Sequence, residues 1–252
     1  MNEIGLLFLL LPVAAFSGWY VARRGSERTS GAKVSELSSN YFRGLNYLLN
    51  EQQDKAIEVF LQLAEYNRDT VETHLALGNL FRRRAEVDRA IRVHQNLIAR
   101  PSLSDEEKTV ALLELGEDYM RAGLLDRAET LFTDLVAMDA LAPVALNHLV
   151  AIYQHERDWN KAIDIARKLE AATGESQGAS IAQFYCELAE QARSRKAWAE
   201  ARGFLDEACA AEGDCVRASM ILGHIEASNG NPDAAIAAFE HVAERDVDYV
   251  PE

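Results

Sequence analysis

One spacing recurs along most of the chain and constrains its fold more than any other feature. An alanine is followed four positions later by a mostly bulky residue, and successive alanines lie 34, 38, 34, 39 and 34 residues apart. Twelve residues before each alanine stands a mostly small residue, often followed three positions later by an aromatic. The six alanines are Ala56, Ala90, Ala128, Ala162, Ala201 and Ala235, and the small positions are Gly44, Gly78, Gly116, Val150, Ala189 and Gly223. This period predicts a chain of stacked supersecondary units.

The pattern inside each unit resembles the tetratricopeptide repeat, a helix-turn-helix. In such a pair, the small residue on the first helix lets the alanine of the second approach closely, and the aromatic fills the space where the helices diverge. The predicted second helices begin at turn-forming or acidic residues, namely Asp54, Asp88, Gly123 with Asp126, Asp158, and Asn231 with Pro232. Ser104 and Glu107 match a capping box that opens the first helix of the third repeat.

The sequence therefore predicts an all-α fold, a right-handed superhelical solenoid of about six repeats over residues 38–246, with the start of a further repeat at 247–252. The two longer spacings place extra residues near 101–104 and 173–179, which we interpret as loops between repeats, either tolerated insertions or partner contacts. A solenoid normally ends in a polar cap. Because Ile236, Phe239 and Val242 would be left bare, we expect the natural chain to continue or to meet a partner there.

The N-terminus contains an apolar run without a charged side chain, residues 4–21. Eighteen helical residues span about 27 Å, enough to cross a thin bilayer. Trp19 and Tyr20 suit the headgroup level, and Arg23 and Arg24 follow, so the positive-inside rule places the later residues in the cytoplasm. We predict a transmembrane anchor at residues 1–23 with these four side chains at the membrane interface. Residues 24–37, rich in Ser, Gly, Arg and Lys, are predicted to be a flexible linker.

A cleaved secretory signal is the alternative interpretation of this run, since Ala15-Phe16-Ser17 resembles a cleavage site. A signal peptide carries its positive charges before the apolar run, whereas here they all follow it, which favours a retained anchor.

Composition excludes several classes of function. The net charge of −14 argues against nucleic acid, because phosphate binding needs a basic face. The three cysteines, Cys186, Cys209 and Cys215, match no metal-ligand spacing and indicate a reducing compartment. The histidines form no HExxH, and neither a phosphate-binding loop nor a GxSxG elbow is present. We predict that the chain is not an enzyme and has no metal site or cofactor.

Binding is the remaining function, and the first helix of each pair is expected to line the concave surface. Counted from the small position, the inward sites lie three before, one after and four after it. The inward sites are Leu75, Asn79 and Arg82, then Leu113, Glu117 and Met120, then Asn147, Ala151 and Gln154, then Cys186, Glu190 and Arg193. Their polar members are the candidate partner-binding residues, because amides and guanidinium groups can hold a peptide backbone. Solvated positions without a ligand remain the alternative.

Five segments together resemble the bacterial lipopolysaccharide assembly protein B family over almost the whole chain. They are LLFLLLPVAAFSGWYVARR (6–24), NYLLNEQQDKAIEVF (46–60), HLALGNLFRRRAEVDRAIRVHQNLI (74–98), LGEDYMRAGLLDRAETLF (115–132) and AQFYCELA (182–189). The resemblance implies a single-pass adaptor of the bacterial inner membrane with its repeats facing the cytoplasm. It further implies that the adaptor helps the membrane zinc protease FtsH degrade the lipid A precursor deacetylase. A lipopolysaccharide-sensing membrane protein restrains such adaptors through the transmembrane region.

The chain departs from this family in one respect. Family members finish in a rubredoxin-like domain with two CxxC pairs that hold a metal, and no such pair occurs here. Functions that need the metal are therefore not expected of this chain. Two other functions stay open: a membrane-tethered repeat scaffold for another cell-envelope complex, and an enzyme built on helical repeats.

Overall fold

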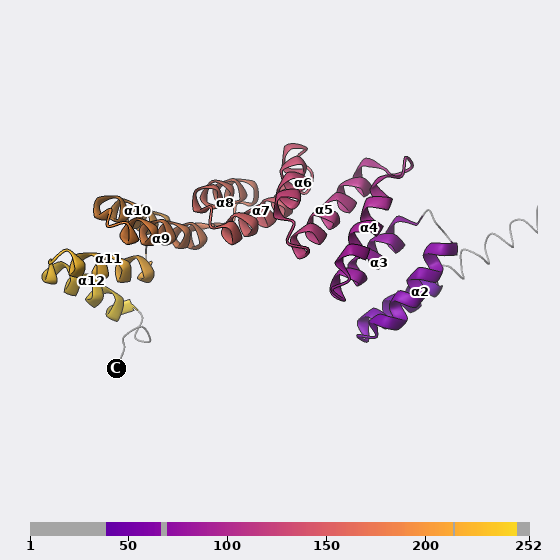
Figure 1. The fold of residues 1–252 in the computed structure, drawn as a ribbon, viewed down its shortest axis with the longest axis horizontal. Helices are drawn as coiled ribbons and strands as arrows, with labels where there is room; N and C mark the ends of the chain where they lie inside the picture. Colours follow the sequence, from indigo (N-terminus) through magenta and orange to yellow (C-terminus); the bar gives the residue numbers. More distant parts are fainter. Residues whose placement is uncertain (1–38, 67–69, 214, 246–252) are drawn as a thin grey trace, which may run out of the picture. The chain divides into compact units, whose positions relative to one another are not determined.

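The computed structural model describes residues 39–66, 70–213 and 215–245, and these residues form helices joined by short turns (Figure 1). After the helical residues 39–49, the helices are α2 Gln53–Tyr66, α3 Val71–Arg83, α4 Val87–Ile98, α5 Asp105–Arg121, α6 Leu125–Ala137, α7 Ala142–Glu156, α8 Trp159–Thr173, α9 Gly178–Ser194, α10 Trp198–Ala211, α11 Val216–Ser228 and α12 Pro232–Arg245. The described part contains no strand, so the predicted all-α class is confirmed. The predicted anchor, linker and further repeat lie outside the described residues.

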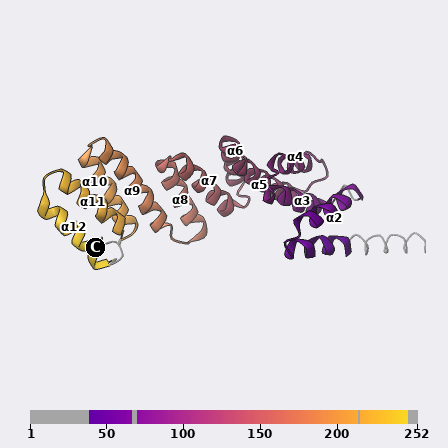
Figure 2. The same cartoon turned by 60° about the horizontal axis from the view of Figure 1, so that its bottom comes forward.

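The chain separates into two compact units, residues 1–101 and residues 102–252. The first holds α2, α3 and α4, and the second holds α5 to α12. Within each unit the helices come in pairs, and α3 beside α4, α9 beside α10 and α11 beside α12 are clear in both views (Figures 1 and 2). Second helices also pack on the next first helix, as α6 does on α7 and α8 on α9. The predicted helix-turn-helix repeats are therefore present in each unit.

Helix starts follow the residues that the sequence analysis identified. The amide of Glu107 donates to Ser104 Oγ at 3.2 Å, and the amide of Ser104 donates to Glu107 Oε2 at 2.9 Å. This capping box satisfies two amides that have no partner within α5. Asp158 Oδ1 caps α8 by accepting from the Lys161 amide at 3.3 Å. Pro232 is the first residue of α12, where a missing amide proton has no cost to the helix.

The turn inside each repeat has the same backbone form in all six described repeats. Seven residues after the small position, the backbone is left-handed, with φ between 58° and 79°. The next residue donates its amide proton to the carbonyl five residues earlier, as Gln52 does to Tyr47 at 2.8 Å. This bond ends the first helix in a Schellman motif. The left-handed residues are Glu51, Ala85, Gly123, Arg157, Lys196 and Gly230.

The core of each pair corrects one expectation. A Cβ atom placed on Gly116 would lie 2.6 Å from the ring of Phe132, and one placed on Gly223 would lie 2.5 Å from the ring of Phe239. The small residue therefore accommodates the bulky residue sixteen positions later, rather than the alanine. The alanines are nonetheless central to the core, since five of the six have no exposed surface. Gly44 with Phe60 and Gly78 with His94 repeat the arrangement.

A cation lies over the aromatic of the first helix in four consecutive repeats. Each cation follows its aromatic by eight residues and comes from the second helix of the same pair. The four pairs are Lys55 over Tyr47 at 5.7 Å, Arg89 over Phe81 at 3.9 Å, Arg127 over Tyr119 at 5.7 Å and Lys161 over Tyr153 at 4.8 Å, measured to the ring centroid. Such contacts favour the closed helix pair. Ala192 and Glu226 occupy the aromatic position in the last two repeats.

The predicted loops are present at 101–104 and at 174–177, where the chain is not helical. The added length of the two longer repeats lies mostly in their first helices, which the loop prediction did not include. Helices α5 and α9 each have 17 residues, whereas α3 and α11 have 13. The capping box at Ser104 starts α5 one turn earlier than α3 starts in its own repeat. In α9, a Cβ on Gly178 would lie 2.5 Å from the Ala211 carbonyl oxygen, so this added turn packs closely against the end of α10.

Candidate partner-binding surface

The predicted inward positions of α7 are open to solvent. Asn147, Ala151 and Gln154 are exposed, and Val144, one turn before Asn147, is 41% exposed. These four residues lie on one face of the helix and form what we call the α7 stripe. Asn147 Nδ2 donates to the Pro143 carbonyl oxygen at 3.0 Å, which leaves the amide oxygen to accept from a ligand. The stripe thus combines two side-chain amides with apolar surface and no charge.

On α5, the structure brings the predicted residue Glu117 against α7. Glu117 Oε1 lies 3.3 Å from His148 Nε2, and both side chains are half-buried. The His148 ring in turn stacks on Phe132, with ring centroids 4.7 Å apart. These contacts hold the carboxylate of Glu117 in place rather than leave it mobile. Met120, also half-buried, lies one turn after Glu117.

On α9, two predicted residues pair with each other. Arg193 Nε donates to Glu190 Oε2 at 2.7 Å, three residues earlier on the same helix. Both side chains remain partly open to water, so the pair contributes about 0–1 kcal/mol to stability. A partner that binds here must compete with this ion pair or bind it as a unit.

Cys186, another predicted inward residue of α9, is fully buried, so the expectation that it faces a partner is wrong. Its sulfur lies 3.8 Å from that of Cys215, just before α11, because α11 covers this part of α9. Burial raises the pKa of the Cys186 thiol to about 12. The thiol therefore stays protonated at neutral pH and offers no nucleophile.

A polar link that was not predicted from the sequence joins α9 to α11. Arg217 Nη1 donates to Gln183 Oε1 at 2.9 Å, and Nη2 donates to Glu187 Oε1 at 2.6 Å. Gln183 and Arg217 stand 34 residues apart, one repeat, so they occupy equivalent positions on neighbouring first helices. That spacing was a usable signal, because equivalent positions of stacked repeats lie side by side.

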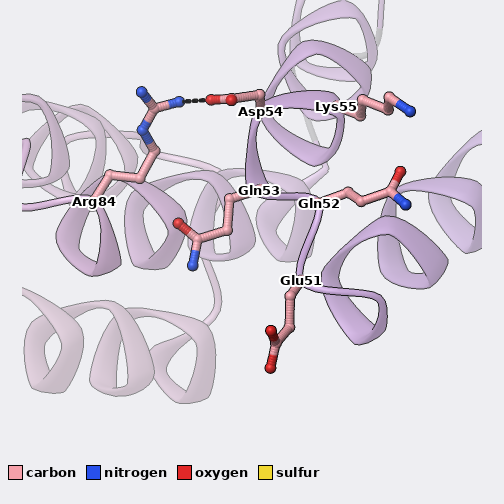
Figure 3. A pocket seen from close by; sticks show the side chains of 6 residues that line it. All are labelled: Glu51, Gln52, Gln53, Asp54, Lys55 and Arg84. Carbon is pink, nitrogen blue, oxygen red and sulfur yellow. Dashed lines mark hydrogen bonds and ion pairs between the residues drawn. The ribbon is translucent and has the colours of Figure 1, made fainter.

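In the first unit, Asn79 and Arg82 on α3 are half-buried. Neither lines the hollow of about 430 Å³ beside the first turn, whose walls are Glu51, Gln52, Gln53, Asp54, Lys55 and Arg84 (Figure 3). Arg84 Nη1 donates to Asp54 Oδ1 across the hollow, and Arg84 Nε lies 3.1 Å from Glu86 Oε1. Because the guanidinium is already used by two carboxylates, the hollow is a weaker candidate than the α7 stripe.

Neither a metal site nor a membrane-spanning helix is found among the described residues. No group of three or more His, Cys, Asp or Glu side chains in this part of the chain could hold a metal ion. None of its helices has both the length and the apolar character needed to cross a membrane. The predicted membrane-interface residues, Trp19, Tyr20, Arg23 and Arg24, lie outside the described residues.

The repeat geometry agrees with comparisons to known proteins. Models of the tetratricopeptide repeat match residues 73–108, 113–176 and 186–248. The chain belongs to the tetratricopeptide repeat family. Among solved structures, the C-terminal part of a repeat-containing protein from Cytophaga hutchinsonii has a TM-score of 0.54 at 14% identity, covering 81% of this chain and 78% of its own. That likeness shows the fold alone.

This tetratricopeptide repeat protein is also similar to curated relatives. It is 42% identical to lipopolysaccharide assembly protein B of Escherichia coli (strain K12) over 98% of this chain and 64% of that protein. It is 39% identical to the Haemophilus influenzae protein of the same name over 99% of this chain and 65% of that protein. The predicted resemblance is confirmed, and the chain spans just under two thirds of the length of these relatives.

Proposed function

We propose that this protein is a non-catalytic inner-membrane adaptor of lipopolysaccharide assembly, which presents the lipid A precursor deacetylase to the membrane protease FtsH. One observation carries the proposal: relatives named lipopolysaccharide assembly protein B match nearly the whole chain at 39–42% identity. That similarity supports a role in lipopolysaccharide assembly. We further propose that the adaptor promotes proteolysis of the deacetylase and that a lipopolysaccharide-sensing membrane protein restrains it.

The α7 stripe supports a binding role for the repeats. Side-chain amides of Asn147 and Gln154 can donate to and accept from the backbone of an extended peptide segment. Val144 and Ala151 add apolar contact without charge, so binding there does not require a charged partner. A segment of the deacetylase or of the protease is the proposed ligand of this stripe.

Membrane attachment is the second part of the proposal. The uncharged run 4–21 followed by Arg23 and Arg24 supports a single-pass anchor with the repeats in the cytoplasm. An anchor in the same membrane as the protease raises the effective concentration of each for the other without any new contact. Weak contacts on the α7 stripe would then suffice for presentation.

The half-life of the deacetylase in living cells tests the proposal. Deleting this protein is expected to lengthen that half-life several-fold after translation is stopped. Expressing the Asn147→Ala, Gln154→Ala double variant in the deletion strain should leave the deacetylase half-life long. The variant should accumulate normally, because both changes are on exposed side chains. Expressing the Gln191→Ala variant, which changes an exposed side chain of α9, in the deletion strain should restore rapid degradation of the deacetylase.

An unchanged deacetylase half-life in the deletion strain would disprove the proposed adaptor role. Affinity purification of the anchored protein in mild detergent would then identify the alternative. Recovery of a different envelope complex, without the protease, would favour a membrane-tethered scaffold for that complex.

A further inference from the structure

The first described helix, residues 39–49, presents an apolar side to solvent. Phe42 is 61% exposed and Leu49 is 81% exposed, and because Leu49 follows Phe42 by seven positions, both lie on the same side of the helix, two turns apart. The opposite side is fixed by the core, since Gly44 is buried against Phe60 and Tyr41 packs edge-on against the same ring at 5.8 Å. Phe42 and Leu49 are therefore held outward by the packing of the first repeat.

This surface is unusual for the first unit of a repeat array. Terminal repeats need a polar outer face to stay soluble, whereas burying an exposed Phe and an exposed Leu on the same side of a helix is favourable. The linker that precedes this helix, residues 24–37, is rich in Ser, Gly, Arg and Lys and has little apolar surface to cover it. Whatever covers Phe42 and Leu49 must therefore be something other than this linker.

Charge indicates which occupant fits. Residues 1–101 carry 13 Lys and Arg against 11 Asp and Glu, whereas residues 102–252 carry 13 against 29. Arg43, adjacent to Phe42, is exposed, and Arg23, Arg24, Arg28 and Lys33 precede it in the sequence. An anionic surface attracts this basic end of the chain and repels the acidic second unit.

Chain length keeps the helix close to the bilayer. The 14 residues of the linker 24–37 have a root-mean-square span of about 20 Å and a fully extended limit of about 50 Å. If residues 4–21 cross the membrane, Phe42 and Leu49 stay within this reach of the headgroups. The lipid surface is thus present at high effective concentration.

We propose that Phe42 and Leu49 dock onto the anionic lipid surface of the inner membrane, with Arg43 against the lipid phosphates. This inference rests on the proposed membrane attachment and adds a second contact to it. An aromatic and a leucine suit the boundary between headgroups and acyl chains, and a neighbouring arginine adds attraction to phosphate. Docking would turn a flexible tether into a defined placement of the first repeat at the bilayer.

Photo-crosslinking of the full chain tests the docking. A benzophenone amino acid is placed at position 42, and in a matched protein at position 207, an exposed glutamate of α10 in the acidic unit. Each protein is reconstituted into vesicles of phosphatidylcholine with about one third phosphatidylglycerol, an anionic content that gives a strong surface potential. Irradiation is expected to give several-fold more lipid adduct at position 42 than at position 207.

Three other outcomes would overturn the proposal in different ways. Adducts at position 42 to protein rather than lipid would assign the surface to a second copy or another protein. Equal lipid adducts at both positions, with the chain resisting carbonate extraction, would reject docking and leave the anchor intact. Loss of the chain from the vesicles on carbonate extraction would remove the membrane attachment itself, and with it the docking.

A variant of the surface gives an independent readout. With the benzophenone moved to Asn46, which is exposed on the same helix, the Phe42→Ser, Leu49→Ser double variant should lose most of the lipid adduct. Its thermal unfolding midpoint should match that of the parent, because both side chains are already exposed. Replacing the anionic lipid by phosphatidylcholine alone, which keeps the phosphate but has no net charge, should also reduce the adduct, and this separates attraction to an anionic surface from simple proximity.

Discussion

At the scale of single residues, His74 links the stability of the first unit to pH. Its Nδ1 lies 2.8 Å from the Thr70 carbonyl oxygen, which can only accept, so Nδ1 carries the proton. Nε2 then accepts from Arg100 Nη2 at 2.7 Å. Burial lowers the pKa of His74 most, and Arg100 lowers it further, while the Thr70 hydrogen bond acts in the opposite direction. Folding therefore favours the neutral ring.

We predict that the free energy of unfolding decreases as pH falls below the ordinary histidine value of 6.5. A lowered pKa in the folded state means that the unfolded chain binds the proton more readily, so acid favours unfolding. Urea unfolding at about pH 7.5 and about pH 5.5 measures the effect, since these values bracket the ordinary pKa. His74→Gln should lose part of the difference, and His155→Gln, exposed on α7, should keep it.

The range from about pH 7.5 to about pH 5.5 lies above the titration of Glu226, whose protonation would also lower the free energy of unfolding. Arg202 Nε and Asn231 Nδ2 donate to the Glu226 carboxylate at 2.7 Å and 2.9 Å. These hydrogen bonds lower the pKa of Glu226 below its ordinary value of 4.5. The stability that the Glu226 carboxylate contributes to the folded state is complete above pH 4.5 and is lost only as pH falls below that value. A pH dependence unchanged by His74→Gln would contradict the tautomer and contacts assigned to His74.

At the scale of elements, the two helices of a pair can approach closely because the small residue on the first helix leaves room for a bulky side chain of the second. In the third repeat, the ring of Phe132 occupies the space directly above Gly116. Phe132 is fully buried, so it has little freedom to move aside. The glycine is therefore required by packing at this position, although it weakens the helix locally.

We predict that Gly116→Ala destabilises the protein by about 1–3 kcal/mol, because the added methyl overpacks the core. Gly203→Ala in α10 is the matched control, since no atom lies within 4 Å of a Cβ at that position. There the change should stabilise by about 0.5–1 kcal/mol through helix propensity alone. Denaturant midpoints of the two variants measure both effects. Equal shifts of the same sign would contradict the packing role of Gly116.

The same elements show how much of the fold the sequence could predict. Helix pairing, the capping box at Ser104 and the start of α12 at Pro232 were all predicted, because period and caps are local signals. The extra turn of α9 was not, since it depends on Gly178 packing against the end of α10. The repeated cation over each aromatic could have been found, because the eight-residue spacing is visible in the sequence.

The candidate surface was less predictable than the fold. Asn147 and Gln154, which the spacing assigned to the partner-facing side of their helix, are exposed on α7. It placed Cys186 wrongly, because an inward position becomes buried when the next first helix covers it, and that depends on the packing of α11. Arg217 was missed since its role appears only when equivalent positions of two repeats are compared.

At the scale of the whole molecule, charge is distributed unevenly. The second unit carries 29 acidic against 13 basic residues, so its compact state contains substantial like-charge repulsion. Described ion pairs such as Arg217 with Glu187 and Arg193 with Glu190 are partly exposed. Pairs of that kind contribute about 0–1 kcal/mol each and are screened by salt. Long-range repulsion, which salt also screens, acts over the entire unit.

We predict that repulsion outweighs these pairs, so that salt stabilises the folded chain at neutral pH. Raising sodium chloride from about 20 mM to about 300 mM, which shortens the Debye length to well under 10 Å, should raise the melting temperature by a few degrees in nonionic detergent. Near the isoelectric point of about 4.9 the net repulsion vanishes, so the same addition should no longer stabilise. A lower melting temperature in salt at neutral pH would mean that local ion pairs, rather than net charge, dominate the electrostatics of the repeats.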